Sequence, residues 1–113
     1  EAALKLKDAS GCKFCFDFAH AICAANGLGL RHDDVMAGFA VLKPDMYHLC
    51  DGDINGENDV HWHYGEGSYD LDKYLARYIA PDALVTMETG GKPAGIQPWI
   101  NDREYIRRLQ RQL

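Results

Sequence analysis

The chain has 113 residues, of which 47 % are hydrophobic, and its formal net charge is −5. This composition predicts one folded domain over residues 1–113 and excludes a disordered chain, and no apolar run approaches the roughly 20 residues that a membrane-spanning helix needs. An acidic chain also has no general electrostatic attraction for the phosphate backbone of nucleic acids.

The first part of the chain predicts a helix, a strand and two further helices. Residues 1–8 have a helical composition, and an aromatic, strand-like run covers residues 12–18. That run leads into an alanine-rich helix over residues 19–29, which ends in a glycine, the common C-terminal cap. The next helix, over residues 33–42, begins with aspartates suited to an N-cap and ends before Pro44.

The middle of the chain predicts two more strands, separated by a long polar loop and a helix. Residues 46–51 form a short strand, and a glycine-rich loop with two acid-and-histidine groups follows it. Residues 69–79 carry apolar side chains at helical spacing, as in an amphipathic helix. Residues 82–89 form a third strand that is almost continuously apolar up to its end.

The C-terminal part predicts a loop and one last helix. Residues 90–98 are rich in glycine and proline, and residues 102–113 have a helical pattern with several arginines. We interpret these arginines as the solvated face and the final turn of a helix rather than as a nucleic-acid patch.

Strands and helices therefore alternate, which predicts an α/β fold with parallel strands joined by crossover helices. We expect the strands to be buried on both faces, as in a parallel sheet within a helical layer. Three such strand-and-helix units account for the whole chain.

The cysteines are interpreted as small buried hydrophobes of a protein in a reducing compartment, the cytoplasm. They are Cys12, Cys15, Cys23 and Cys50. Cys12 and Cys15 form a C-x-x-C, but residues three apart on a strand point to opposite faces, so the pair is poorly placed to chelate a metal or close a disulfide.

Each predicted strand ends in groups that bind metals. The first strand ends at Asp17, and His20 follows three residues later. The second strand carries His48 and Asp51, and the third ends in Glu88. Because the carboxyl ends of parallel strands face one crevice, these side chains are expected to converge.

Asp59 and His61 lie in the loop after the second strand, and in extended backbone this spacing points both side chains the same way. A mixed set of Asp, Glu and His suits Zn²⁺, Mn²⁺ or Co²⁺. Each residue also has an ordinary structural alternative: Asp17 as a helix cap, His48 as a core histidine. We interpret His32 and His63 as structural or surface residues, and Gly65 and Gly67 as turn formers.

Four segments carry a resemblance to a known family. CFDFAHA, MYHLCDGD, DVHWHYGEG and LVTMET, in that order, resemble the last three strand-and-loop units of the xylose isomerase-like TIM barrel superfamily, from about Cys12 to the C-terminus. That superfamily contains sugar and sugar-phosphate isomerases and epimerases, and metal-dependent apurinic-site endonucleases. The resemblance implies that residues 1–113 form the C-terminal portion of a TIM (β/α)8 barrel.

The resemblance also implies roles for single residues. Asp17, His48 and Glu88 match metal ligands of both branches, and Glu88 matches a catalytic acid/base of the epimerases. His20, Asp59 and His61 match residues that touch substrate or bind a second metal.

Two departures from the family pattern follow. An eight-stranded barrel has roughly 250 residues, so we expect the N-terminal strands of the barrel to be absent from this chain. The chain is then an incomplete fragment, unless a further copy or a complementing chain closes the barrel. Val60 stands where the nucleases carry Arg, and the loop CDGDING is acidic.

The expected function is therefore a metal-dependent sugar or sugar-phosphate isomerase/epimerase that acts on a small carbohydrate. The alternative is a zinc-dependent apurinic-site endonuclease that hydrolyses DNA.

Overall fold

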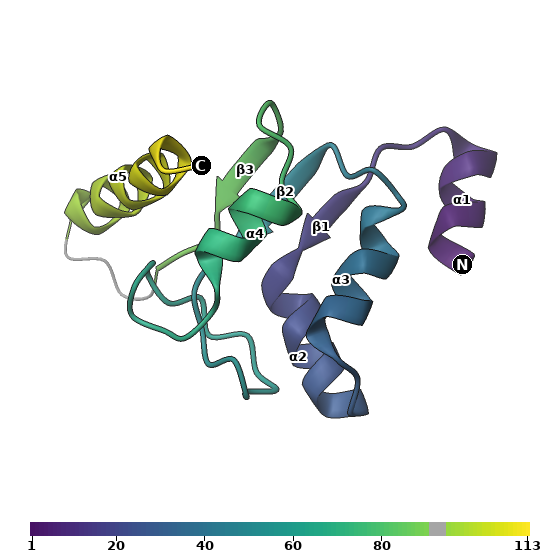
Figure 1. Ribbon diagram of the computed structural model, residues 1–113, viewed down its shortest axis with the longest axis horizontal. Helices are drawn as coiled ribbons and strands as arrows, with labels where there is room; N and C mark the ends of the chain where they lie inside the picture. Colours follow the sequence, from purple (N-terminus) through teal and green to yellow (C-terminus); the bar gives the residue numbers. More distant parts are fainter. Residues whose placement is uncertain (91–94) are drawn as a thin grey trace.

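The computed structural model describes residues 1–90 and 95–113, which form a small α/β fold (Figure 1). The elements in chain order are α1 (Ala2–Ser10), β1 (Cys15–Asp17), α2 (Phe18–Leu28), α3 (His32–Ala40), β2 (Met46–Leu49), α4 (Leu71–Arg77), β3 (Leu84–Met87) and α5 (Gln97–Arg111). The predicted α/β class, with strands alternating with helices, is confirmed.

The strands form one open parallel sheet in the order β1-β2-β3. Cys15 pairs with Met46 and Asp17 with His48, and Met46 pairs with Leu84 on the other side. The helices α2 and α3 connect β1 to β2, and the long loop with α4 connects β2 to β3. The predicted parallel pairing through crossover helices is therefore confirmed, and all strand carboxyl ends lie at one edge.

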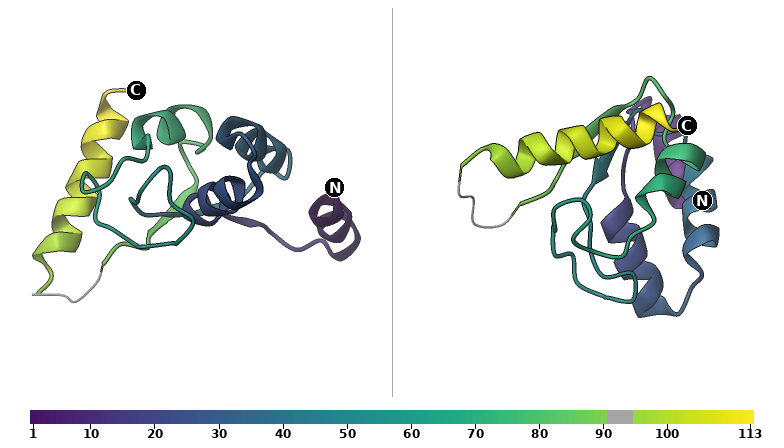
Figure 2. Two further views of the ribbon diagram at one scale, coloured as in Figure 1. Left: turned by 90° about the horizontal axis from the view of Figure 1, so that it is seen from below. Right: turned by 60° about the vertical axis from the view of Figure 1, so that its left-hand side comes forward.

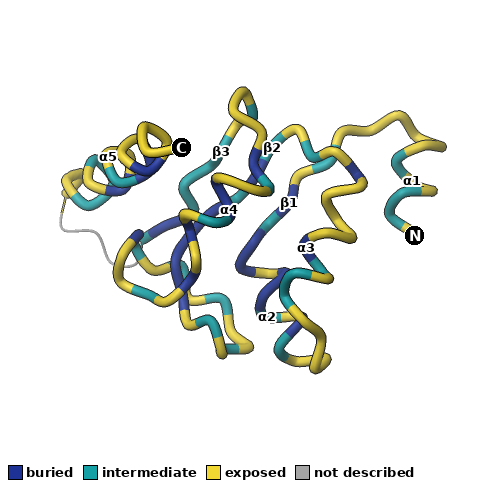
Figure 3. The backbone as a smooth tube through the Cα atoms, viewed as in Figure 1, coloured by how far each residue is buried: buried dark blue, intermediate teal, exposed yellow. Residues whose placement is uncertain are grey.

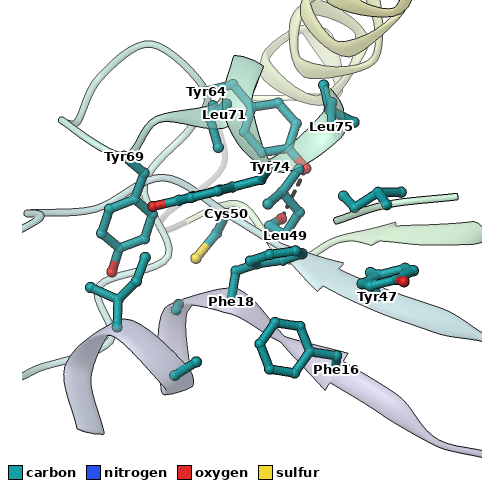
Figure 4. Close-up of a cluster of buried hydrophobic side chains, with 14 of the residues drawn as sticks. Phe16, Phe18, Tyr47, Leu49, Cys50, Tyr64, Tyr69, Leu71, Tyr74 and Leu75 are labelled. Atoms are coloured by element: carbon teal, nitrogen blue, oxygen red, sulfur yellow. Dashed lines mark hydrogen bonds between the residues drawn. The ribbon is translucent and has the colours of Figure 1, made fainter. Parts of the chain in front are cut away.

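One face of this sheet is covered by helices (Figure 2). Phe16, Tyr47 and Leu49 point to that face and belong to a single core with buried residues of α2, α4 and α5. Phe18 lies at its centre, with ring centroids 4.9 Å from Tyr74 and 5.8 Å from Tyr47. Figure 4 shows this aromatic cluster, in which the Tyr64 hydroxyl donates to the carbonyl of Leu49 over 2.9 Å.

The opposite face of the sheet is open, so the prediction that the strands are buried on both faces is wrong. Cys15 and Leu84 on that face are exposed, and Met46 and Thr86 are only half-buried. Figure 3 shows how burial varies along the chain. Within residues 1–90 and 95–113, all helices that pack on the sheet lie against its other face. Apolar residues on both faces of a strand favour burial of both faces, but burial also needs a layer of other residues to cover each face.

The helix α1 stands apart from the core, as Figures 1 and 2 show. All its residues are exposed or half-buried. Lys7 contacts the rest of the molecule by donating from its ammonium group to the Leu42 carbonyl.

Several boundaries differ from the sequence prediction. β1 ends at Asp17 because the side chain of Asp17 caps α2, which therefore begins at Phe18. α3 has Arg31 as its N-cap, with the aspartates in its first turn. α5 begins at Gln97 rather than at residue 102, with Pro98 in its first turn, where a missing backbone donor costs nothing. Part of the predicted Gly/Pro loop, residues 91–94, lies outside the described residues.

The cysteines are less uniform than predicted. Cys50 is buried and Cys23 is half-buried, but Cys12 and Cys15 are exposed, so the interpretation of all four as buried hydrophobes is wrong. Cys12 precedes the strand, and Cys15 points to the open face of the sheet. All four thiols are free.

Among residues 1–90 and 95–113, no helix combines the length and the apolar character needed to cross a membrane.

Candidate metal centre

Asp17, His48 and Glu88 come together at the carboxyl edge of the sheet, on its open face. Asp17 and His48 are paired in register, and Glu88 directly follows β3, where its backbone N–H donates to the Leu49 carbonyl of β2 over 3.1 Å. One ligand atom from each of the three side chains lies within 4.8 Å of the other two. The convergence expected from parallel strands is therefore observed.

The His48 imidazole lies between the two carboxylates. Its Nδ1 is 3.5 Å from Asp17 Oδ2 and 3.2 Å from Glu88 Oε1. The side chains retain exposures of only 14 % for Asp17, 29 % for His48 and 33 % for Glu88. Two partly desolvated carboxylates around one nitrogen repel each other, and a divalent cation relieves that repulsion.

Asp17 has two roles at once. Its Oδ1 accepts a hydrogen bond from the His20 backbone N–H over 3.0 Å, which caps α2. The cap fixes the carboxylate so that Oδ2 remains directed at the His48 and His20 rings. Asp17 can therefore cap α2 and belong to the candidate metal centre at the same time.

The loop after β2 brings Asp59 and His61 to the same centre. Asp59 Oδ2 is 3.0 Å from His61 Nε2 and 3.0 Å from His20 Nε2. His20 Nδ1 in turn lies 3.6 Å from Asp17 Oδ2. Six of the seven acids and histidines that the sequence singled out thus form one continuous network of carboxylates and imidazoles.

His61 is held in an unusual conformation. Its φ is +52°, in the left-handed region that non-glycine residues seldom occupy. Its Nδ1 lies 2.7 Å from the Glu88 carbonyl oxygen, and its own carbonyl accepts from the Gly90 N–H over 2.9 Å. Because a carbonyl only accepts, Nδ1 carries the proton, which leaves Nε2 directed at Asp59. This second hydrogen bond is typical of histidines that bind metals.

Cys50 is a member of this site that the sequence analysis did not identify. Its thiol lies 3.7 Å from Asp59 Oδ1, and Cys50, Asp59 and His61 form a second group of candidate ligand atoms within 4.8 Å of one another. Burial, and after it the charges of Asp59 and Asp17, raise the pKa of the Cys50 thiol. The missed signal was its spacing: Cys50 is two residues after His48, at the same alternation along the chain.

Asp51, which the sequence placed among the strand-end groups that bind metals, has a structural role instead. It is 2 % exposed, and its carboxylate accepts from the backbone N–H groups of Gly52, Gly65 and Tyr69 over 2.8 to 3.1 Å. The loop from residue 52 to residue 69 is thus folded around one buried carboxylate, and this fold presents Asp59 and His61 to the centre.

The remaining histidines also have structural partners. His32 Nε2 lies 2.7 Å from the Asn26 side-chain oxygen, and His63 Nδ1 lies 2.6 Å from Asp102 Oδ2. Asp102, in α5, is 2 % exposed and also accepts from the Tyr64 N–H and the Thr89 hydroxyl. These contacts agree with the interpretation of His32 and His63, and those of Asp102 dock α5 onto the loop.

Comparison of the chain with protein-family models, with curated proteins and with solved structures finds no match. The function is therefore inferred from the site itself.

Proposed function

We propose that this chain carries the metal centre of a sugar or sugar-phosphate isomerase/epimerase with a TIM-type barrel. The observation that carries the proposal is the meeting of Asp17, His48 and Glu88 at the carboxyl edge and on the open face of a parallel sheet. In sheets of this kind, ligands bind at the carboxyl ends of the strands. Glu88 is the proposed catalytic residue.

The residues at the centre have complementary tasks. Asp17, His48 and Glu88 would hold a divalent ion, Mn²⁺, Zn²⁺ or Co²⁺, which when bound supplies polarisation of a sugar carbonyl. The Glu88 carboxylate, which remains one-third exposed, would take a proton from the carbon next to that carbonyl and return it to a neighbouring position. His48 and Asp17 would keep the carboxylate oriented, since His48 lies between the two acids.

The open sheet supports the barrel part of the proposal. The free face carries Leu84, which is 70 % exposed, beside half-buried Met46 and exposed Cys15. Such apolar surface on an unpaired sheet is normally covered. Further parallel strands, from the same protein or from a complementing copy, would cover it and close the barrel.

The experiment that tests the activity is solvent proton exchange. The protein, loaded with Mn²⁺ or Co²⁺, is incubated in D₂O with a panel of ketoses and ketose phosphates. We expect deuterium next to the carbonyl, and Glu88→Gln should slow its incorporation by about 100-fold or more.

Glu57→Gln is the matched control. Glu57 is an exposed glutamate in the loop that carries Asp59 and His61, and it lies outside the network of carboxylates and imidazoles. It should leave the exchange rate unchanged. Absence of exchange by the wild-type protein across the whole panel would contradict the proposal.

A zinc-dependent apurinic-site endonuclease is the second candidate. The contacts of His20 and His61 with the same oxygen of Asp59 favour it, since they place a second set of metal donors beside the first. The net charge of −5 and the apolar Val60 between Asp59 and His61 favour the isomerase, because binding of DNA depends on neutralising phosphates. Cleavage of an abasic duplex by the zinc-loaded protein, without ketose exchange, would select the nuclease.

A further inference from the structure

We propose that Cys50, Asp59 and His61 form a zinc position with a thiolate ligand, beside the Asp17, His48 and Glu88 position. The proposal goes beyond the isomerase function, because it concerns metal binding alone and needs no substrate. It adds Cys50 to the residues that bind metal in this chain.

The three donor atoms come from two segments that the fold holds together. Cys50 directly follows β2, and Asp59 and His61 lie in the loop that Asp51 organises. The antiparallel bridge between Asp51 and Trp62 holds the segment after the carboxyl end of β2 against the residue that follows His61. One sulfur, one oxygen and one nitrogen thereby lie within 4.8 Å of one another.

The orientation of the side chains also fits a shared ion. The Asp59 carboxylate directs Oδ1 toward the Cys50 sulfur, 3.7 Å away, and Oδ2 toward His61 Nε2, 3.0 Å away. When an ion lies between Asp59 Oδ2 and His61 Nε2, Nε2 supplies its lone pair, because Nδ1 donates to the Glu88 carbonyl. A sulfur, a carboxylate oxygen and an imidazole nitrogen are all ligands that Zn²⁺ accepts.

Exposure increases across the three ligands, from 3 % for Cys50 to 17 % for the Asp59 and 42 % for the His61 side chain. An ion held by them would have its sulfur ligand toward the core, where Figure 4 shows Cys50, and its imidazole ligand on the exposed side, where His20 Nε2 also lies 3.0 Å from Asp59 Oδ2. Three protein ligands leave a fourth position that His20, a water molecule or a substrate can take.

The thiolate distinguishes this position from its neighbour. Thiolates select Zn²⁺ and Co²⁺ over Mn²⁺ and Mg²⁺, whereas the all-oxygen-and-nitrogen set of Asp17, His48 and Glu88 accepts Mn²⁺ as well. As the bond from sulfur to the ion forms, the Cys50 proton is released to solvent. The alternative role of Cys50 is that of a core thiol that donates its S–H to Asp59 and binds nothing.

The experiment is titration of the metal-free protein with Co²⁺, followed by absorption spectroscopy. Coordination by sulfur gives a near-ultraviolet charge-transfer band, which oxygen and nitrogen ligands do not give. We expect the band in the wild-type protein, its persistence in the triple variant Cys12→Ser/Cys15→Ser/Cys23→Ser, and its loss in Cys50→Ser. Zn²⁺ should abolish the band by displacement, and Mn²⁺ should not.

Competition with a zinc chelator gives the second measurement. Cys50→Ser should weaken the binding of zinc at this position by more than about 100-fold, since loss of a mere hydrogen-bond partner of a ligand already costs roughly 10–100-fold. Cys23→Ser is the control, because it removes a half-buried thiol outside the ligand group and should leave the affinity unchanged.

A band that survives in Cys50→Ser, or a folded triple variant without a band, would overturn the proposal. If Cys50→Ser does not fold, the triple variant alone decides, because Cys50 is then the sole thiol. The test is also separate from that of the isomerase. Asp17→Asn should leave the band in place, so the absence of ketose exchange together with an intact band would refute the proposed activity and leave the zinc position standing.

Discussion

At the scale of single residues, Asp51 shows how one side chain positions others. Its carboxylate accepts three backbone hydrogen bonds inside the loop, and it is almost fully buried. Buried donors without acceptors are costly, so the carboxylate both stabilises the loop and fixes its path. Asp59 and His61 reach the candidate metal centre because the loop takes this path.

We expect Asp51→Ala to lower the free energy of unfolding by about 3 kcal/mol, because it leaves the buried N–H groups of Gly52 and Tyr69, and the partly buried one of Gly65, without acceptors. Urea denaturation followed by circular dichroism measures this change. Asp72→Ala, at an exposed position in the first turn of α4, is the control and should cost no more than about 0.5 kcal/mol. Similar stability of the two variants would contradict the role assigned to Asp51.

The chemistry of a side chain could be predicted at this scale, but its partner could not. Asp17, His48 and Glu88 stood out because an acid or a histidine at the end of an apolar strand is costly to bury without a partner. Asp51 stood out for the same reason, yet it faces backbone amides. Cys50 did not stand out, because a thiol is as suitable for a core as for a metal, and its place beside Asp59 became visible only in the tertiary structure.

At the scale of elements, close approach of two loop segments depends on Gly67. A side chain there would collide with the Gly52 backbone and with the Asp51 carboxylate. Gly65, by contrast, is needed for its positive φ of +92°. The sequence analysis predicts both glycines as turn formers. This is right for Gly65, whereas Gly67 is needed because only a glycine leaves room for the Gly52 backbone and the Asp51 carboxylate.

Gly67→Ala should therefore lower the free energy of unfolding by about 2 kcal/mol or more, since backbone atoms cannot easily move away. Gly38→Ala is the matched substitution: its added methyl group would meet open space on α3, and the loss of flexibility in the unfolded chain should stabilise the protein by about 0.5–1 kcal/mol. Thermal unfolding of both variants measures the opposite signs. A destabilised Gly38→Ala variant or a neutral Gly67→Ala variant would contradict this account.

Element types were predictable because their signals are local: helical spacing, a capping glycine and short apolar runs. Element ends were less predictable. The last helix begins at Gln97, earlier than its sequence pattern indicates, and Asp102 became a buried anchor rather than the first polar residue of a helix. Tertiary contacts with His63 and Thr89 decide that outcome.

At the scale of the whole molecule, the core is rich in tyrosine. Tyr47, Tyr64, Tyr69 and Tyr74 are all buried, and burial is the largest cause that raises the pKa of each hydroxyl, for Tyr74 to about 12. In the unfolded chain these hydroxyls ionise near pH 10. The unfolded state therefore loses protons first as the pH rises.

Stability from these tyrosines is fully present below about pH 10 and is lost as the pH rises toward 12 and beyond. We expect alkaline unfolding in this range, with tyrosinate absorbance and loss of circular dichroism rising together. Tyr74→Phe should move the transition to higher pH, because one buried ionisable group is removed. Ionisation of all tyrosines near pH 10 with unchanged circular dichroism would contradict the prediction.

The sequence by itself determined the class of the fold, the order of its strands and helices and, apart from Asp51, the set of acids and histidines that meet at the site, because these follow from local patterning and from the geometry of parallel strands. Only the tertiary structure decided which face of the sheet is covered, that the Asp51 carboxylate accepts from backbone amides, and that the Cys50 thiol lies beside Asp59. Those outcomes depend on contacts between residues far apart in the chain, such as Cys50 with Asp59 and His63 with Asp102, which no local pattern encodes.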